Sequence, residues 1–206
     1  MPIIDLRKQF KHLYQPSAKK FSVVDVPPMN FLMIDGAGNP NTSQDYRDAL
    51  EALYGLSYTL KFGVKLGKYG KQSYDYPVMA LEGLWWMDDM RDFSAARKDD
   101  WKWTMMIMQP DIITPDLVEL ARADLIKKKN LVAAAQLRFE VYHEGPSAQI
   151  MYFGPYADES PTIQRLHDFI IESGHQLRGK HHEIYLSDPR RTAPEKLKTV
   201  IRQPMQ

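Results

Sequence analysis

A glutamate in a short alternating segment is the side chain in this sequence best placed to do chemistry. Residues 181–186 read HHEIYL, so strand alternation turns Ile184 and Leu186 to one face and Glu183 and Tyr185 to the other. If the apolar pair faces the helices, Glu183 lies in an open groove, where aromatic walls raise its pKa by desolvation or let it attract a cation. The alternative interpretation is an ordinary solvent-facing strand glutamate.

A second carboxylate takes the matching place in an earlier segment. Glu82 lies within residues 79–86 and shares its strand face with Trp86. Two carboxylates that look into one groove can divide the acid and base roles or hold a dication, although no spacing here demands either. A half-exposed strand would also explain Glu82.

Tryptophans and tyrosines supply the flat surfaces that such a groove would need. Trp85, Trp86 and Trp103 lie on two predicted neighbouring strands, where a planar ligand could stack on them. Because adjacent strand residues point to opposite faces, at least one of Trp85 and Trp86 is structural. Tyr152 and Tyr156 bracket a Gly-Pro turn, and their hydroxyls either donate to a ligand oxygen or belong to edge residues with rings in the core.

Composition narrows the function classes. The 206 residues include 27 Lys and Arg against 26 Asp and Glu, so the net charge of +1 is too balanced for a nucleic-acid binder that works by counterion release. The absence of cysteine excludes disulfides, thiol nucleophiles and Cys-ligated metals. The 11 methionines and 23 aromatic residues (4 Trp, 11 Tyr, 8 Phe) suit a pocket for planar apolar ligands, although they also fill cores.

Other site chemistries find no support in the motifs. His181 and His182 point apart on a strand, and the sequence has no HExxH, dinucleotide, P-loop or nucleophile-elbow motif, so we expect neither a metal nor a cofactor. No segment resembles a signal peptide or a membrane span, which predicts a cytoplasmic protein without a membrane partner. The expected partner is a small aromatic molecule.

The elements that must position these residues follow from periodicity and turn signals. Residues 8–20 are expected to form a surface arm and residues 63–77 a long mobile loop that could act as a lid. Helices are predicted over 43–62, from Thr114 to about 129, and over 159–172. Strands are predicted over 21–26, 31–34, 78–86, 101–108, 148–153, 180–186 and 198–202, with 88–100 as a long hairpin connection.

The two halves of the chain repeat one order of elements. An apolar strand, a glycine turn, a helix and two further strands occur in a first module of about 21–142 and in a second of about 148–206. The predicted fold class is therefore α+β within a single domain. The duplicated strand-helix-strand-strand modules form an antiparallel sheet with helices on one face and a ligand groove on the other.

At its C-terminal end the chain resembles the GyrI-like small-molecule-binding family. The resemblance covers roughly residues 149–205, and the first module fits the duplicated architecture of the family more loosely. The matching features are Gly154-Pro155-Tyr156, the helix after it, Gly174, the segment 181–189 and the segment 198–204. In that family a glutamate matching Glu183 lies at the bottom of the groove and contacts cationic or polar parts of aromatic drugs.

Stand-alone members of the family imply a more specific activity. Some hydrolyse cyclopropanoid alkylating agents, electrophilic toxins whose strained ring is opened by water. The implied mechanism stacks the toxin on aromatic walls, uses Glu183 to position or deprotonate water, and uses Tyr152 or Tyr185 to polarise the conjugated carbonyl. The leading hypothesis is thus a protein that binds planar, hydrophobic, often cationic molecules in a groove between the two modules, with hydrolytic detoxification of cyclopropanoids as an activity that the resemblance adds. The alternatives are a non-catalytic drug sensor or sequestering protein and a protein that inhibits DNA gyrase by contact.

Overall fold

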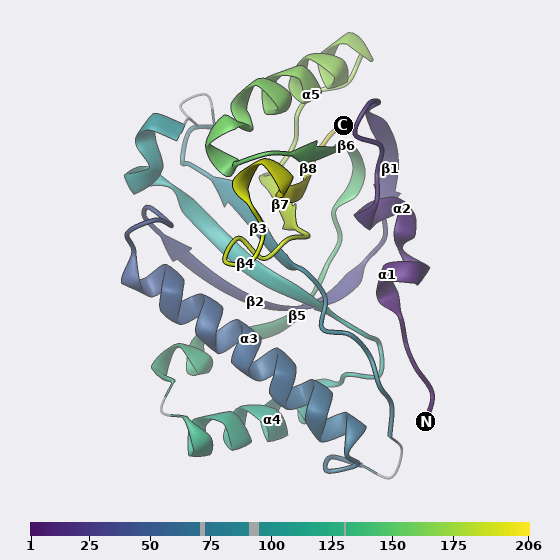
Figure 1. Cartoon of the computed structure of the whole chain (residues 1–206), viewed down its shortest axis with the longest axis vertical. Helices are drawn as coiled ribbons and strands as arrows, with labels where there is room; N and C mark the ends of the chain where they lie inside the picture. The colour runs from purple at the N-terminus through teal and green to yellow at the C-terminus, as the bar shows by residue number, and fades with distance from the viewer. Residues whose placement is uncertain (71–72, 91–94, 130) are drawn as a thin grey trace.

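One eight-stranded antiparallel sheet runs through the computed structural model, which describes residues 1–70, 73–90, 95–129 and 131–206 (Figure 1). The strand order is β1-β6-β8-β7-β3-β4-β2-β5. The strands are β1 (Ser22–Val26), β2 (Met29–Ala37), β3 (Leu81–Trp86), β4 (Lys102–Gln109), β5 (Arg138–Tyr142), β6 (Gly145–Phe153), β7 (His181–Tyr185) and β8 (Lys198–Pro204). The predicted α+β class with an antiparallel sheet is confirmed.

The strand order follows the duplication that the sequence predicts. Strands β3-β4-β2-β5 form one half of the sheet, β7-β8-β6-β1 form the other in the mirrored order, and the halves join where β3 pairs with β7. Of the outer strands, β1 of the first module pairs with β6 of the second, whereas β5 pairs with β2 of its own module. Strand β5 was not predicted.

Three longer helices, α3 (Gln44–Lys65), α4 (Pro115–Lys128) and α5 (Ser160–Glu172), lie on one side of the sheet (Figure 1). Helix α3 packs on β2 and β4, α4 packs on α3, and α5 packs on β6 and β8. Helices α3 and α4 each begin at a side-chain cap, because the Ser43 hydroxyl accepts from the Tyr46 amide and the Thr114 hydroxyl accepts from the Leu117 amide. None of the described helices is both long and apolar enough to cross a bilayer.

The other face of the sheet is covered by the N-terminal segment. Two short helices there, α1 (Leu6–Gln9) and α2 (Lys11–Tyr14), bury Leu6, Leu13 and Tyr14. The expectation of a surface arm over 8–20 is therefore wrong for its apolar residues. The many basic and polar residues of this segment make its short amphipathic pattern hard to recognise in the sequence. Its apolar side chains are buried against strands that are distant in sequence.

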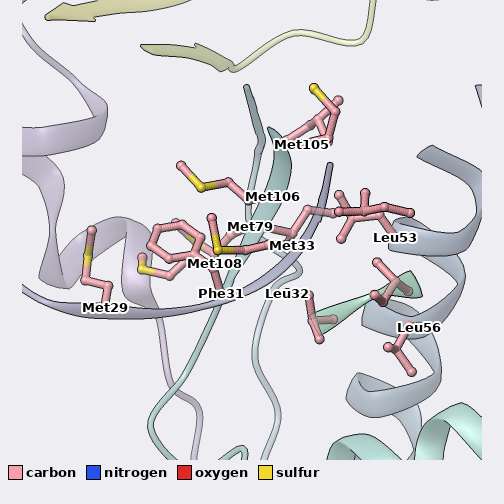
Figure 2. Close-up of a cluster of buried hydrophobic side chains, with 14 of the residues drawn as sticks. Met29, Phe31, Leu32, Met33, Leu53, Leu56, Met79, Met105, Met106 and Met108 are labelled. Carbon is pink, nitrogen blue, oxygen red and sulfur yellow. The ribbon is translucent and has the colours of Figure 1, made fainter. Parts of the chain in front are cut away.

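Methionines fill the core beside β2 and β4. Figure 2 shows Met29, Met33, Met106 and Met108 gathered with Phe31, and all five side chains are buried. The unbranched thioether adapts to irregular gaps between strands, which suits this role. These methionines therefore serve packing, the second of the two roles that composition left open.

The segment 63–77, predicted as a mobile loop, is anchored at several of its described residues. Residues 63–65 belong to α3, the Tyr69 hydroxyl donates to Asp124 of α4 at 2.5 Å, and Tyr76 is buried. Figure 1 places the segment at the C-terminal end of α3. Residues 71–72, and residues 91–94 of the predicted 88–100 connection, lie outside the described residues.

Replacing Gly36 with alanine is expected to destabilise the fold. An ideal Cβ at Gly36 would lie 2.1 Å from Cη2 of Trp103, the tryptophan opposite it on β4. Because this ring is fully buried and cannot move aside freely, overpacking should cost about 1–3 kcal/mol in the free energy of unfolding, measured with urea. The matched control is Gly70→Ala, where nothing lies within 4 Å of the added atom. Equal stability of the two variants would contradict this packing.

Candidate functional site

Strand register places Glu183 on the face of the sheet that carries the helices. Glu183 pairs with Gly83 on β3, and its face neighbour His181 pairs with Trp85. The Trp85 ring lies 6.1 Å from that of Tyr46 on α3. The expectation that Glu183 faces away from the helices is therefore wrong. Alternation separates Glu183 from Ile184, but both faces of this sheet are covered, so a buried isoleucine does not identify the helix face.

Hydrogen bonds hold the Glu183 carboxylate in one orientation. The Tyr185 hydroxyl donates to Oε2 of Glu183 at 2.7 Å, and Nε2 of His181 lies 3.1 Å from Oε1. The Trp85 indole N–H in turn donates to the Tyr185 hydroxyl at 2.9 Å. The Glu183 side chain keeps 13% of its surface exposed, so its carboxylate is fixed on a side chain that is partly open to solvent.

Gly83 makes room for this chain of contacts. An ideal Cβ on Gly83 would lie 2.7 Å from Nε1 of Trp85 and 3.2 Å from the Tyr185 hydroxyl. Since these atoms belong to the hydrogen bonds that lead to Glu183, a side chain at position 83 would displace them. The glycine opposite Glu183 in the sheet is thus part of how the site is built.

Two further tyrosines, Tyr46 and Tyr156, add aromatic rings around Tyr185 and Glu183. Tyr156 is 37% exposed as a residue, and its ring meets the Tyr185 ring edge-on at 5.5 Å. Burial, followed by the charges of Glu159 and Glu183, raises the pKa of Tyr156 to about 12. Burial and the Glu183 charge also hold the pKa of Tyr185 far above its ordinary value. Both hydroxyls therefore stay protonated and act as hydrogen-bond donors.

A carboxyl group absent from the predicted site is close enough to Glu183 to feel its charge. Glu159 precedes α5 and is 2% exposed, and burial, followed by the Glu183 charge, raises its pKa to about 9. The sequence signal for it was weak, because a glutamate at a helix start normally faces solvent and stabilises the helix dipole. The second carboxyl group of this cluster is Glu159.

Glu82, the carboxylate predicted to share the groove, points to the opposite face. It pairs with Ile184 in the sheet, accepts from the Tyr14 hydroxyl at 2.5 Å, and lies 3.0 Å from Nε2 of His182. The expectation of two carboxylates in one groove is wrong for Glu82 and Glu183. Trp86 also points away from Glu183, with Nζ of Lys180 3.3 Å from its ring centroid.

Glu82 belongs to a fully buried ionic network on that face. His182 Nδ1 lies 2.9 Å from Glu144, and Arg202 donates to Glu144 at 3.0 Å and to the Leu13 carbonyl at 2.8 Å. Despite opposing desolvation, the His182 and Arg202 charges lower the pKa of Glu144 to about 2, and Glu144 raises the pKa of His182 to about 9. The network ties the N-terminal segment to the sheet.

The remaining predicted site residues differ in their access to Glu183. Trp103 shares the face of Trp85 but is 1% exposed and lies edge-on beneath Tyr46 at 5.2 Å, so it has no free surface for a ligand. Trp85 is also buried, and its indole N–H donates to the Tyr185 hydroxyl. Tyr152 shares the face too, and its hydroxyl donates to the Pro155 carbonyl at 3.1 Å. Among the described residues, no group of three His, Asp or Glu side chains is arranged to hold a metal ion.

Comparisons with known proteins agree with this architecture. Residues 19–206 match the family model of the GyrI-like small molecule binding domain. An uncharacterized conserved protein from Listeria innocua is 37% identical, with 98% of this chain and 100% of that chain covered and a TM-score of 0.89. A hydrolase from Listeria innocua is 36% identical, with 98% and 100% covered and a TM-score of 0.85.

More distant structures share the fold alone. The C-terminal domain of EcmrR is 9% identical, with 91% of this chain and 97% of that chain covered and a TM-score of 0.56. A search of curated proteins found no match to the chain.

Proposed function

The chain belongs to the GyrI-like small-molecule-binding family, and on that basis we propose that it binds planar, hydrophobic, often cationic molecules beside Glu183 and hydrolyses cyclopropanoid toxins there. The observation that carries the proposal is the Glu183 carboxylate, which is held by Tyr185 and His181 and remains partly exposed. A fixed carboxylate beside aromatic rings can attract a cation and can accept a proton from water.

Binding would use the exposed part of the cluster. A flat ligand that stacks on Tyr156 brings a positive group toward Glu183, where partial desolvation strengthens the attraction between the charges. Tyr46 and Tyr185 would border the ligand with further ring surface. Such a site would select ligands by their flat shape and positive charge rather than by one functional group, as expected of a site for several drugs and toxins.

Hydrolysis would use Glu183 as the base. A water molecule gives a proton to the carboxylate while its oxygen bonds to the methylene carbon of the cyclopropane. The ring C–C bond breaks, its electron pair completes an aromatic ring, and the conjugated carbonyl oxygen becomes a phenol oxygen. The Listeria hydrolase, 36% identical over almost the whole chain, supports a hydrolytic rather than a purely sequestering role. A sequestering protein would return the compound unaltered.

Tyr185 is proposed as the residue that positions this base. Replacing it with phenylalanine removes the 2.7 Å hydrogen bond to Glu183 and leaves the ring in place. We expect kcat to fall by about ten- to a hundred-fold with a smaller change in KM, since one hydrogen bond to a charged group contributes about 1.5–3 kcal/mol.

Tyr152→Phe is the matched control, because the Tyr152 hydroxyl bonds to the Pro155 carbonyl instead. Its kcat should stay near that of the wild type, measured by chromatography of the ring-opened product. If Tyr152→Phe lost turnover and Tyr185→Phe did not, the tyrosine that supports catalysis would be Tyr152 rather than Tyr185.

A further inference from the structure

Glu159 is a buried carboxyl group that the base mechanism leaves unused. Only 2% of the residue is exposed, and within the described part of the chain its Oε1 atom has no hydrogen-bond partner. Burying an ionised carboxylate without a bonded cation is costly, so such a group holds a proton instead. Protonated Glu159 is therefore a buried acid whose Oε1 atom is not engaged in a hydrogen bond with the described residues.

The fold brings this acid into the Glu183 cluster. Glu159 follows the turn that carries Tyr156, and it lies near Thr199, which pairs in the sheet with Tyr185 on one side and Tyr152 on the other. All of these side chains lie on the sheet face of Glu183. The acid and the base therefore belong to one cluster.

The charged groups around Glu159 set its protonation. Burial and the Glu183 charge both raise its pKa, which reaches about 9, while the Thr199 hydroxyl and the Lys98 ammonium act in the opposite direction but more weakly. Tyr152, Tyr156 and Tyr185 are uncharged at neutral pH, as tyrosines ordinarily are, and their raised pKa values keep them so at higher pH. Two carboxyl groups whose environments differ in this way can take opposite roles in proton transfer.

We infer that Glu159 is the proton donor of the site, giving its proton to the substrate oxygen that becomes the phenol. This assignment rests on the proposed hydrolysis. As water bonds to the cyclopropane carbon, one water proton moves to Glu183 and the Glu159 proton moves to the former carbonyl oxygen. Exchange with solvent then returns Glu183 to the carboxylate and Glu159 to the acid, so the net reaction adds one water to the substrate.

Glu159→Gln tests this role, because the amide keeps the size of the side chain but cannot transfer a proton. We expect kcat to fall by about 10²–10⁴-fold, the range of general-acid contributions, while ligand affinity changes only a few-fold. The control is Glu172→Gln, an exposed position near the end of α5, which should behave like wild type. Wild-type kcat should also decline above pH 9, and this alkaline decline should be absent from the residual activity of Glu159→Gln.

Infrared difference spectra provide a readout that does not depend on turnover. Wild type at neutral pH should show a protonated carboxyl band that disappears in Glu159→Gln and titrates near pH 9. If wild type forms product and Glu159→Gln matches it in rate and pH profile, Glu159 is not the donor and the hydrolysis stands. If wild type forms no product, the hydrolysis and the donor role both fail. Absence of the infrared band also overturns the assignment, even if the variant does not fold.

Discussion

Glu183→Gln should lower kcat/KM for a cyclopropanoid substrate by about 10²–10⁴-fold, because the amide cannot accept the proton that water must lose. The amide oxygen can still accept from the Tyr185 hydroxyl, and the side chain is partly exposed, so the fold should be retained. Affinity for a cationic aromatic ligand should also fall, since the attracting charge is removed. Affinity for a neutral ligand of the same shape should change little.

The matched control is Glu140→Gln, an exposed glutamate on edge strand β5 that pairs with Arg138. It should match wild type in both turnover and affinity, measured by product chromatography and by calorimetric titration. If Glu183→Gln also retained wild-type turnover and affinity for cations, the assignment of the site to Glu183 would be wrong.

Arg202→Leu should lower the free energy of unfolding by about 3–5 kcal/mol, the range for removing one partner of a buried ion pair. The substitution removes the donor to Glu144 at 3.0 Å and the donor to the Leu13 carbonyl at 2.8 Å. Glu144 is fully buried and would keep His182 as its remaining cationic partner. The loss of the Leu13 contact should also loosen the N-terminal segment, which limited proteolysis would detect.

The same network predicts how stability depends on pH. The pKa of His182 is raised from 6.5 to about 9, so its contribution is complete below pH 6.5 and is lost as the pH rises through 9. The pKa of Glu144 is lowered from 4.5 to about 2, so its contribution is present above pH 4.5 and is lost as the pH falls through 2. Urea denaturation should therefore find the largest contribution between pH 4.5 and 6.5.

Arg190→Leu is the control for the stability measurement, because the Arg190 side chain is 86% exposed in its ion pair with Asp188. Exposed pairs contribute little, so this variant should unfold with the wild-type midpoint. A similarly small effect of Arg202→Leu would mean that the buried network does not hold the N-terminal segment to the sheet.

Much of the fold follows from local signals in the sequence. The Ser43 and Thr114 caps begin their helices where predicted, and alternation predicts the strands that carry Glu82 and Glu183. Strand β5 was missed although Arg138 to Val141 alternate between polar and apolar side chains; at the sheet edge these side chains stay half-buried or exposed. The N-terminal segment was misjudged because Tyr14 is buried through contacts with Glu82 and Met108, which local patterns do not reveal.

The candidate site was only partly predictable. Alternation correctly separates Trp85 from Trp86 and groups Glu183 with Tyr185, but it leaves open which face carries the helices. That choice depends on the packing of α3 and α5 against a sheet built from both modules. Glu159 was missed for a similar reason, since its burial arises where the start of α5 meets β8 rather than from any residue pattern around it.

Hydrolysis in oxygen-18 water tests the central claim most directly. The purified protein would be incubated with a duocarmycin-type cyclopropanoid in this water. The substrate and products would be separated by chromatography, and their masses would be measured by mass spectrometry. The account predicts ring-opened product that carries one heavy oxygen, formed much faster with wild type than with Glu183→Gln or without protein. Recovery of intact compound that had bound to wild type would contradict hydrolysis and identify the protein as a binder.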